Sequence, residues 1–334
     1  MICFRFWMTN KSMKKSLLAL VLLAPSLCFA WGRRGHQTVA EIASILASED
    51  PTAPYLKSRS FDFGYYANVP DFIWKKPSTY AFEKPQHFMD MEIYEREFKK
   101  KPEIKDPFSL SRRDFEKAFP EIKEDAGRAF WRIRELNDQL EFVTKKLRAL
   151  PDGDESRPVR RLLQESWFLT AGVMAHYFGD LGQPLHVSEN YDGLKTNQKG
   201  IHSYFEDDMV DELYPQIQVD VQKLANKKWP EFKMTHANKS VLDILKELSA
   251  KSNKRIEPLL AIDKKVGRKN NKKAAAAYKQ MIIECLTDSS LALGEIYRRQ
   301  TGWKYDGDRF FFFAGEPAYM MPGMPDDPIQ TAKQ

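Results

Sequence analysis

The chain has 334 residues, a formal net charge of +6 and three cysteines. Its first thirty residues hold four basic side chains and no acidic one, so the remainder has a net charge of about +2. This near balance gives little support for binding of polyanions through bulk charge. Because Cys285 is the single cysteine after residue 30, the remainder has no internal disulfide, but its roughly 300 residues can bury an ample core.

The first thirty residues are predicted to be a signal peptide (residues 1–30). Three lysines precede a short apolar run (17–24), and a cleavage region ends at Ala30. The apolar run is too short to span a bilayer. We therefore expect a mature chain that begins at Trp31 and is secreted or periplasmic.

The mature chain is predicted to be all-α, because its apolar residues recur at helical spacing and no long run alternates as a strand would. The predicted helical stretches are, in chain order, residues 39–45, 125–150, 158–180, 241–248, 273–285 and 291–299. Pro158 suits the first turn of its helix. We expect a single compact multi-helix domain over 31–303 and an aromatic, proline-rich extension over 304–334. The lysine-rich residues 264–279 are interpreted as a solvated loop and helix face.

Two pairs of side chains point to a metal site. His176 and Asp180, and likewise His202 and Glu206, are four residues apart, so on a helix both members of a pair leave the same face. Neutral imidazole and carboxylate are ligands for divalent metals. His186 lies between the pairs, so this stretch holds three of the six histidines in the chain. The concentration favours a metal site that supports hydrolysis.

Further candidate ligands lie upstream. Cleavage before Trp31 would free an α-amino group with a pKa near about 8, which can lose its proton and bind metal. His36, Asp71 and His87 follow. Each of these residues alone has an ordinary explanation as a surface, capping or turn residue, but together they are harder to dismiss. Only His236 stays outside the set, and it is interpreted as a surface residue.

The motifs that hold these residues resemble a known superfamily. Residues 31–40 read WGRRGHQTVA, residues 87–90 read HFMD, and residues 176–186 read HYFGDLGQPLH. Over residues 31–211 the order of candidate ligands is similar to that of bacterial zinc-dependent phospholipase C and of the fungal and plant single-strand nucleases (S-one/P-one type). The third motif is the most specific of the three.

This resemblance implies an all-α fold with a trinuclear zinc cleft. One zinc ion would take Asp71, His87, His176 and Asp180. A second would take the Trp31 amino nitrogen and carbonyl oxygen, His36, and Asp180 as a bridge. A third would take His186, His202 and Glu206. The implied reaction is in-line attack on a phosphodiester by a zinc-bridging hydroxide, with Asp71 orienting the attacking water and accepting its proton.

Some sequence features favour the nucleases within this superfamily. The spacing of Trp31 and His36 is similar to theirs. Phe88 and Asp90 fall where nucleases stack and hydrogen-bond a base, although Phe88 as a core residue and Asp90 as a helix cap is an equal alternative.

Other features favour the phospholipases. Glu206 replaces the usual nuclease Asp, residues 200–206 resemble the phospholipase segment, and the loop between His186 and His202 lacks a Gly-Gly-Asn run. Trp74 stands where many nucleases have arginine, with Lys75 or Lys76 as substitutes.

The expected function is a zinc-dependent single-strand endonuclease and 3′-nucleotidase that acts as a monomer on single-stranded DNA, RNA or nucleotides, with no stable protein partner. One alternative is a phospholipase C that acts on phosphatidylcholine-like lipids. Another is a helical periplasmic protein in which zinc only staples the fold.

Overall fold

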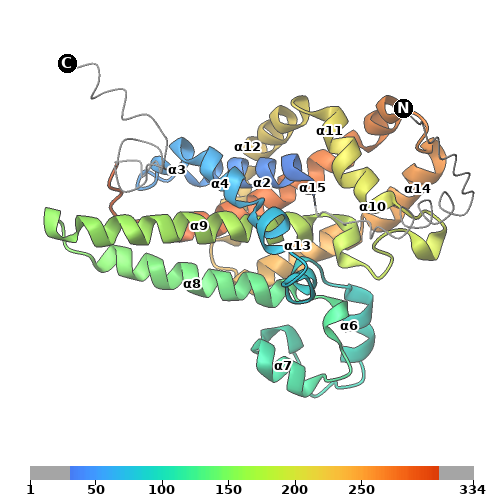
Figure 1. Ribbon diagram of the computed structural model, residues 1–334, viewed down its shortest axis with the longest axis horizontal. Helices are drawn as coiled ribbons and strands as arrows, with labels where there is room; N and C mark the ends of the chain where they lie inside the picture. Colours follow the sequence, from blue (N-terminus) through green and yellow to red (C-terminus); the bar gives the residue numbers. More distant parts are fainter. Residues whose placement is uncertain (1–30, 308–334) are drawn as a thin grey trace, which may run out of the picture.

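Two long helices, α8 (Ala129–Ala149) and α9 (Arg157–Gly182), run side by side along the molecule in the computed structural model, which describes residues 31–307 (Figure 1). Pro158 lies in the first turn of α9, as predicted. Every residue of α9 from Thr170 to Gly182 is buried. A helix that is buried on all sides lies at the centre of a fold, so this half of α9 carries its side chains directly into the core.

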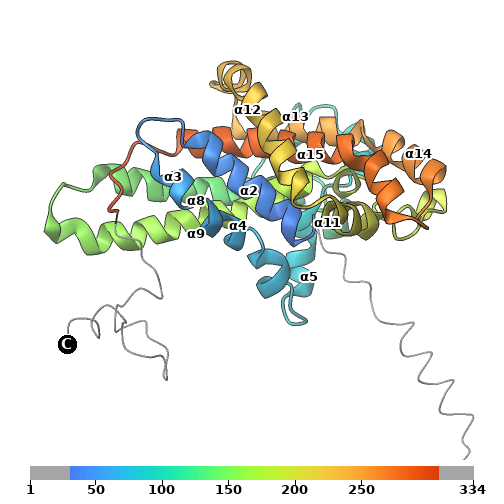
Figure 2. The same cartoon turned by 90° about the horizontal axis from the view of Figure 1, so that it is seen from above.

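Five helices pack directly against α9, namely α2 (Arg33–Ala47), α4 (Ser60–Tyr66), α8, α13 (Val241–Asn253) and α15 (Asn271–Arg299). The longest, α15, packs against α2, α9 and α12 (Gln216–His236), and Figure 2 shows it running the length of the body. The remaining α-helices are α3 (Tyr55–Ser58), α5 (Tyr80–Glu83), α6 (Met91–Phe98), α7 (Arg112–Ala118), α10 (Ile201–Ser203), α11 (Met209–Leu213) and α14 (Ile256–Val266).

Short 3₁₀ and π segments connect these helices. The π-helices are η1 (Pro70–Trp74) and η8 (Tyr204–Asp208). The 3₁₀ segments are η2 (Lys84–His87), η3 (Pro107–Ser109), η4 (Glu124–Ala126), η5 (Asp154–Ser156), η6 (Pro184–Val187) and η7 (Leu194–Thr196). Residues 31–307 contain no strand, only an isolated bridge between Met89 and Gly127. The predicted compact all-α fold is therefore confirmed.

The helix predictions differ from the structure mainly at their ends. The helix expected over 125–150 begins later, at Ala129, because Gly127 has a φ of 89°, which is outside the helical region. The stretches 273–285 and 291–299 belong to one continuous helix, α15. The sequence analysis missed α12, a largely polar helix that contains Pro230.

Several predictions fall at the ends of the chain. The signal peptide (1–30) and residues 308–334 of the extension lie outside the described residues. The extension's first residues pack against the body: Tyr305 stacks on Tyr55 at 4.6 Å, and the Lys304 carbonyl accepts a hydrogen bond from Gln164. Within residues 31–307, no helix combines the length and the apolar character needed to cross a membrane.

Candidate metal centre

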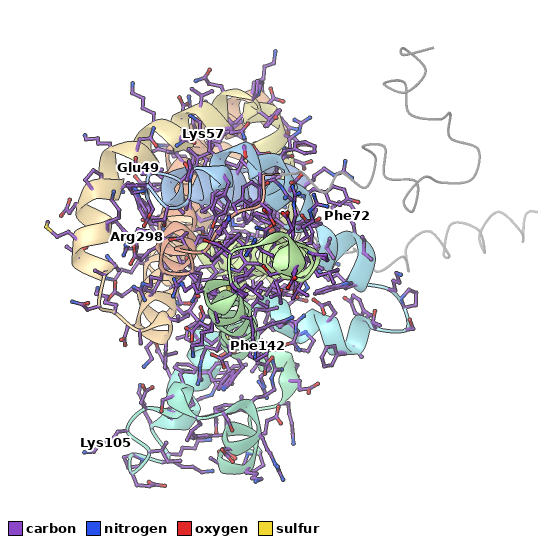
Figure 3. The ribbon with its side chains drawn as sticks, turned by 90° about the vertical axis from the view of Figure 1, so that its left-hand side faces the viewer. Glu49, Lys57, Phe72, Lys105, Phe142 and Arg298 are labelled. Atoms are coloured by element: carbon purple, nitrogen blue, oxygen red, sulfur yellow. The ribbon has the colours of Figure 1, made fainter. Side chains whose placement is uncertain are left out.

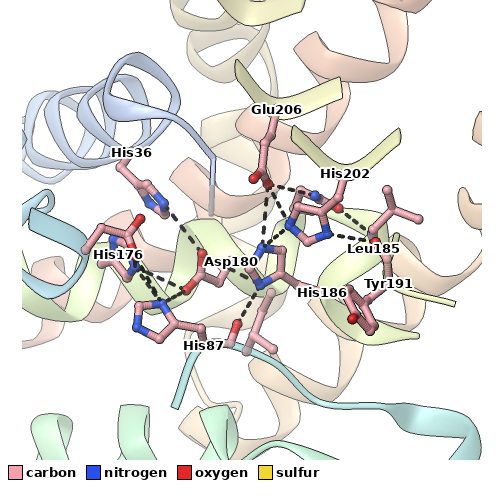
Figure 4. A network of polar contacts seen from close by, with 12 residues as sticks. His36, His87, His176, Asp180, Leu185, His186, Tyr191, His202 and Glu206 are labelled. Carbon is pink, nitrogen blue, oxygen red and sulfur yellow. Dashed lines mark hydrogen bonds and ion pairs between the residues drawn. The ribbon is translucent and has the colours of Figure 1, made fainter. Parts of the chain in front are cut away.

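The structure brings eight of the nine predicted ligands together in one buried centre (Figure 4). None is more than 6% exposed. They come from seven elements: His36 from α2, Asp71 from η1, His87 from η2, His176 and Asp180 from α9, His186 from η6, His202 from α10 and Glu206 from η8. Helix α9 supplies the middle of the centre, and the other elements pack around it.

One half of the centre, here called the Asp180 group, comprises His36, Asp71, His87, His176 and Asp180. Two sets within it could each hold one ion: Asp71, His87 and His176, and His36, His176 and Asp180. His87 Nδ1 lies 3.0 Å from Asp180 Oδ2 and 2.8 Å from His176 Nε2. His36 Nε2 lies 3.5 Å from Asp180 Oδ1. The two oxygens of Asp180 therefore face different histidines, which is the arrangement that a bridging carboxylate requires.

The other half, here called the Glu206 group, comprises His186, His202 and Glu206, which could together hold one ion. Glu206 Oε2 lies 3.1 Å from His202 Nε2 and 3.6 Å from His186 Nε2. The two Nε2 atoms are 3.1 Å apart. His186 Nδ1 lies 3.9 Å from Asp180 Oδ1, so the two groups are neighbours in space.

Backbone carbonyls hold three of the imidazole rings. His176 Nδ1 donates to the Ala67 carbonyl at 2.8 Å, His186 Nδ1 to the His87 carbonyl at 2.7 Å, and His202 Nδ1 to the Tyr191 carbonyl at 2.7 Å. A carbonyl only accepts, so the hydrogen is on Nδ1 and the Nε2 lone pair points into the centre. Metal-binding histidines are oriented in this way.

Several buried atoms of the centre have no hydrogen-bond partner among the described residues. They include both ring nitrogens of His36, Asp180 Oδ1 and Glu206 Oε1. Leaving a buried donor or acceptor unpaired costs about 1–3 kcal/mol, and more for a charged group. Divalent cations bound to these nitrogens and oxygens would remove the cost, and nitrogen and carboxylate donors suit zinc. The residues therefore fit a divalent metal.

Burial sets the protonation of the Asp180 group. It lowers the pKa values of His36, His87 and His176 well below the ordinary range and raises the pKa of Asp180 well above it. The histidines are consequently neutral at pH 7, the form that binds metal.

The Glu206 group behaves differently. Burial opposes ionisation of both partners, but Glu206 raises the pKa of His202, and His202 with His186 lowers the pKa of Glu206 to about 2. Here an ion pair forms within the group itself.

Two local backbone features shape the centre. His202 and Glu206 do not share one α-helix as expected, because α10 gives way to the wider π-helix η8, yet their side chains still meet. At Gly179 a Cβ atom would lie 2.7 Å from His36 Nδ1. The absence of a side chain at this position lets His36 approach Asp180.

The remaining residues singled out by the sequence analysis lie in different environments, some buried and some half-buried. Trp31 is fully buried beside Phe205, and its ring lies over the same glycine as His36. Phe88 is half-buried, so it is not part of the core. Asp90 stands at the N-cap of α6 but makes no capping hydrogen bond, and burial raises its pKa to about 7. His236 lies outside the centre, half-buried against Phe232 and Glu247.

Sequence reasoning missed two polar residues that support the ligands and left a third undecided. Gln183 Nε2 donates to Glu206 Oε2 at 2.9 Å, and Glu83 Oε1 lies 3.4 Å from His87 Nε2. Lys75, which the sequence analysis named only as an alternative to Lys76, donates to Asp71 Oδ1 at 2.9 Å, whereas Lys76 is exposed. Gln183 belongs to the QPxH part of the third motif, which was the one available signal for it.

No protein-family model and no curated protein sequence matches the chain. The likeness to phospholipase C and the single-strand nucleases therefore depends on the motifs and on the geometry of their residues.

Proposed function

We propose that the chain is a zinc-dependent phosphodiesterase, secreted or periplasmic, that acts as a single-strand endonuclease and 3′-nucleotidase. One observation carries the proposal: three sets of nitrogen and oxygen donors adjoin one another around Asp180 in a single buried centre. A metal that only stabilised a fold would need one closed set of four ligands. Adjoining sets are typical of sites that bind both the nucleophile and the phosphate of a phosphodiester.

In this proposal the ligands are shared as the resemblance implies. Asp71, His87, His176 and Asp180 would hold one zinc ion. His36 and Trp31 with Asp180 would hold a second, and His186, His202 and Glu206 would hold the third. When bound, zinc supplies Lewis acidity, which lowers the pKa of water and stabilises charge on phosphate oxygens.

Two residues of the chain then have separate tasks. Asp71 Oδ1 accepts a hydrogen bond from Lys75, which leaves its second carboxylate oxygen to orient the attacking water and accept its proton. The Lys75 side chain is almost fully buried. Burial lowers the pKa of its ammonium group, but Asp71 outweighs burial and the pKa is raised. The lysine therefore stays protonated beside the centre, where its ammonium group suits an anionic phosphate oxygen.

The substrate is tested with mature protein that begins at Trp31. We expect it to release nucleotides from single-stranded DNA or RNA, and a chelator to abolish the release. If neither nucleic acid is cleaved but phosphocholine is released from phosphatidylcholine, the phospholipase alternative is correct.

A second experiment separates an enzyme from a zinc-stapled protein. His186→Ala removes one imidazole of the Glu206 group, and His236→Ala is its control because His236 lies outside the centre. We expect His186→Ala to lose hydrolysis and to keep a cooperative thermal transition. A staple predicts the reverse: a large loss of stability and no hydrolysis by the wild-type protein.

A third experiment tests the terminal ligand. One alanine added before Trp31 replaces the α-amine at that residue by an amide, which cannot bind metal through nitrogen in the same way. We expect bound zinc to fall by one equivalent and activity to fall with it. Unchanged zinc content and activity would remove Trp31 from the ligand set.

A further inference from the structure

A surface pocket of about 350 Å³ lies beside the metal centre, between the start of α2, helix α4 and η1. Its lining includes Arg33 and Gln37 from α2, Phe61 and Tyr65 from α4, and Phe72 from η1. The volume is within the range of small-molecule sites, which begins near about 300 Å³.

The lining exposes large aromatic side chains to solvent. Phe61 is 68% exposed, Tyr65 62% and Phe72 51%. A single exposed aromatic residue needs no explanation, but three around one pocket form an apolar patch of the kind that marks binding sites. Figure 3 shows Phe72 at the edge of the helical body.

Arg33 adds a positive charge to this patch. Its guanidinium carbon lies 5.0 Å from the centre of the Phe72 ring, and the side chain makes no ion pair with another residue of 31–307. An arginine stacked on an aromatic ring is held in place and still presents its N–H groups to a phosphate or a base edge.

The pocket also offers hydrogen-bond acceptors. Gln37 donates through Nε2 to Glu41, and Asn68 donates through Nδ2 to the Gly64 carbonyl. Neither amide oxygen receives a hydrogen bond from a described residue, so both can accept one from a ligand. The lining thus combines aromatic faces, a cation and amide acceptors.

The pocket and the metal centre share the same two elements. On α2, Arg33 and Gln37 are four residues apart and line the pocket, whereas His36 between them faces Asp180 (Figure 4). On η1, Asp71 is buried in the centre and the next residue, Phe72, is exposed at the pocket. The pocket and the metal centre therefore lie on opposite faces of the same two short segments and are neighbours in the fold.

We propose that this pocket binds unpaired bases of a single-stranded nucleic acid and the phosphate that joins them, next to the bond to be cleaved. The inference rests on the proposed function, which supplies the substrate class. Bases stack on Phe61, Tyr65 and Phe72 because every base has a π face, and Arg33 contacts the backbone.

Charge decides against a choline lipid in the same pocket. A quaternary ammonium group binds over the face of an aromatic ring. Arg33 already occupies a face of Phe72 and would repel a quaternary ammonium group at that ring. An anionic strand gains from the same cation.

The test measures binding instead of hydrolysis. A short, fluorescently labelled oligothymidylate with phosphorothioate linkages is titrated with the zinc-loaded protein, and its anisotropy gives the dissociation constant. We expect Phe72→Ala and Phe61→Ala each to weaken binding about five- to a hundredfold, as loss of a stacked base does. Arg33→Ala should weaken binding and reduce its dependence on salt. Zinc content should stay constant in all three variants.

The controls match the variants in kind. Phe142 is 59% exposed on α8 and has its own cation, Lys146, at 5.4 Å, so Phe142→Ala removes an equivalent aromatic residue far from the pocket (Figure 3). Arg113→Ala removes an exposed arginine from α7. Both should bind as the wild type does.

Three results would overturn the inference: unchanged affinity in all three pocket variants, equal losses in the controls, or a loss confined to binding of phosphatidylcholine vesicles. The two proposals can fail separately. If the wild-type protein cleaves single strands and the pocket variants bind normally, the proposed function stands and the pocket inference is wrong. If the wild-type protein binds the strand through the pocket but cleaves neither natural DNA nor RNA, the proposed function is wrong.

Discussion

The two halves of the metal centre balance charge in opposite ways. In the Asp180 group, burial keeps three histidines neutral and raises the pKa of Asp180, and several buried atoms have no partner. In the Glu206 group, His202 and Glu206 form an ion pair, and Gln183 donates a further hydrogen bond to Glu206. The first half needs an added cation to satisfy its groups. The second half pairs most of its polar atoms within itself, and Glu206 Oε1 is its atom without a partner among the described residues.

The difference shows that similar ligands in one protein can respond differently to loss of metal. Buried polar groups without partners destabilise a fold, whereas a paired and hydrogen-bonded ion pair does not. We therefore expect the Asp180 group to gain more from metal than the Glu206 group.

The largest effect should come from Asp180→Asn. The amide cannot bridge two ions as a carboxylate does, so we expect the rate of hydrolysis to fall by at least about a hundredfold. This loss exceeds the loss expected for residues that only hydrogen-bond to the ligands. Zinc analysis should show fewer bound equivalents than in Glu206→Gln. Similar zinc losses in the two variants would contradict the asymmetry between the groups.

Gly179→Ala should break the Asp180 group without replacing a ligand. The new Cβ would lie 2.7 Å from His36 Nδ1, so the ring must move away from Asp180. We expect one zinc equivalent to be lost and activity to fall roughly tenfold to a hundredfold, as for disturbed metal support. Gly294→Ala on α15 is the control, because its new Cβ would be crowded by the Ala43 carbonyl at 3.3 Å, between two packed helices and away from the ligands. It should lower stability and keep the zinc content.

Gln183→Ala should affect only the Glu206 group. The variant removes the hydrogen bond to Glu206 Oε2, and loss of such a partner typically costs about ten- to a hundredfold in metal affinity. Competition with a chelator should show one weakened zinc equivalent. If instead all equivalents weaken together, the two halves do not act separately.

The smallest effect should come from Asp263→Asn, which loosens the loop before His202. Asp263 accepts hydrogen bonds from Gln198 and Arg268, and Arg268 also holds the Gln198 carbonyl. Burial raises the pKa of Asp263, but these partners outweigh burial and the pKa is lowered. A lowered pKa contributes stability above the unfolded value near about 4, and this contribution is lost as the pH falls through the folded value.

We therefore expect Asp263→Asn to lower stability by about 1–2 kcal/mol at pH 7, as loss of a charged hydrogen-bond partner does. The difference from the wild type in thermal unfolding should shrink towards pH 3. A difference that is independent of pH would show that the charge of Asp263 does not hold this loop.

The sequence predicted the ligands better than the geometry around them. His176 and Asp180 could be paired because a continuous helix fixes which side chains share a face. The π-helix that carries Glu206 could not be predicted from the sequence. A π turn depends on packing of the surrounding helices more than on local residue preferences. The all-α class followed from apolar periodicity, but α12 is polar over most of its length and gave no comparable signal.

The supporting residues were harder to predict still. Glu83 is the last residue of α5 and Gln183 lies between α9 and η6, and no helix periodicity shows which distant histidine or glutamate each will contact. The pocket could not be predicted for the same reason, because its lining residues come together only in the folded chain. Arg33 and Phe72 are far apart in sequence and meet through tertiary packing. At Gly64 the absence of a side chain lets α4 lie close to Gln37 and Glu41 of α2.

The pairing of residues 87–89 with His186 links the two halves of the centre. The Met89 amide donates to the His186 carbonyl at 2.9 Å, and the His186 ring donates to the His87 carbonyl. Ordering His87 in one group therefore also orients His186 in the other. Coupling between two sites is reciprocal, so a displacement of either histidine should be felt in both groups. A change at Gln183, which is not part of this pairing, should stay confined to the Glu206 group.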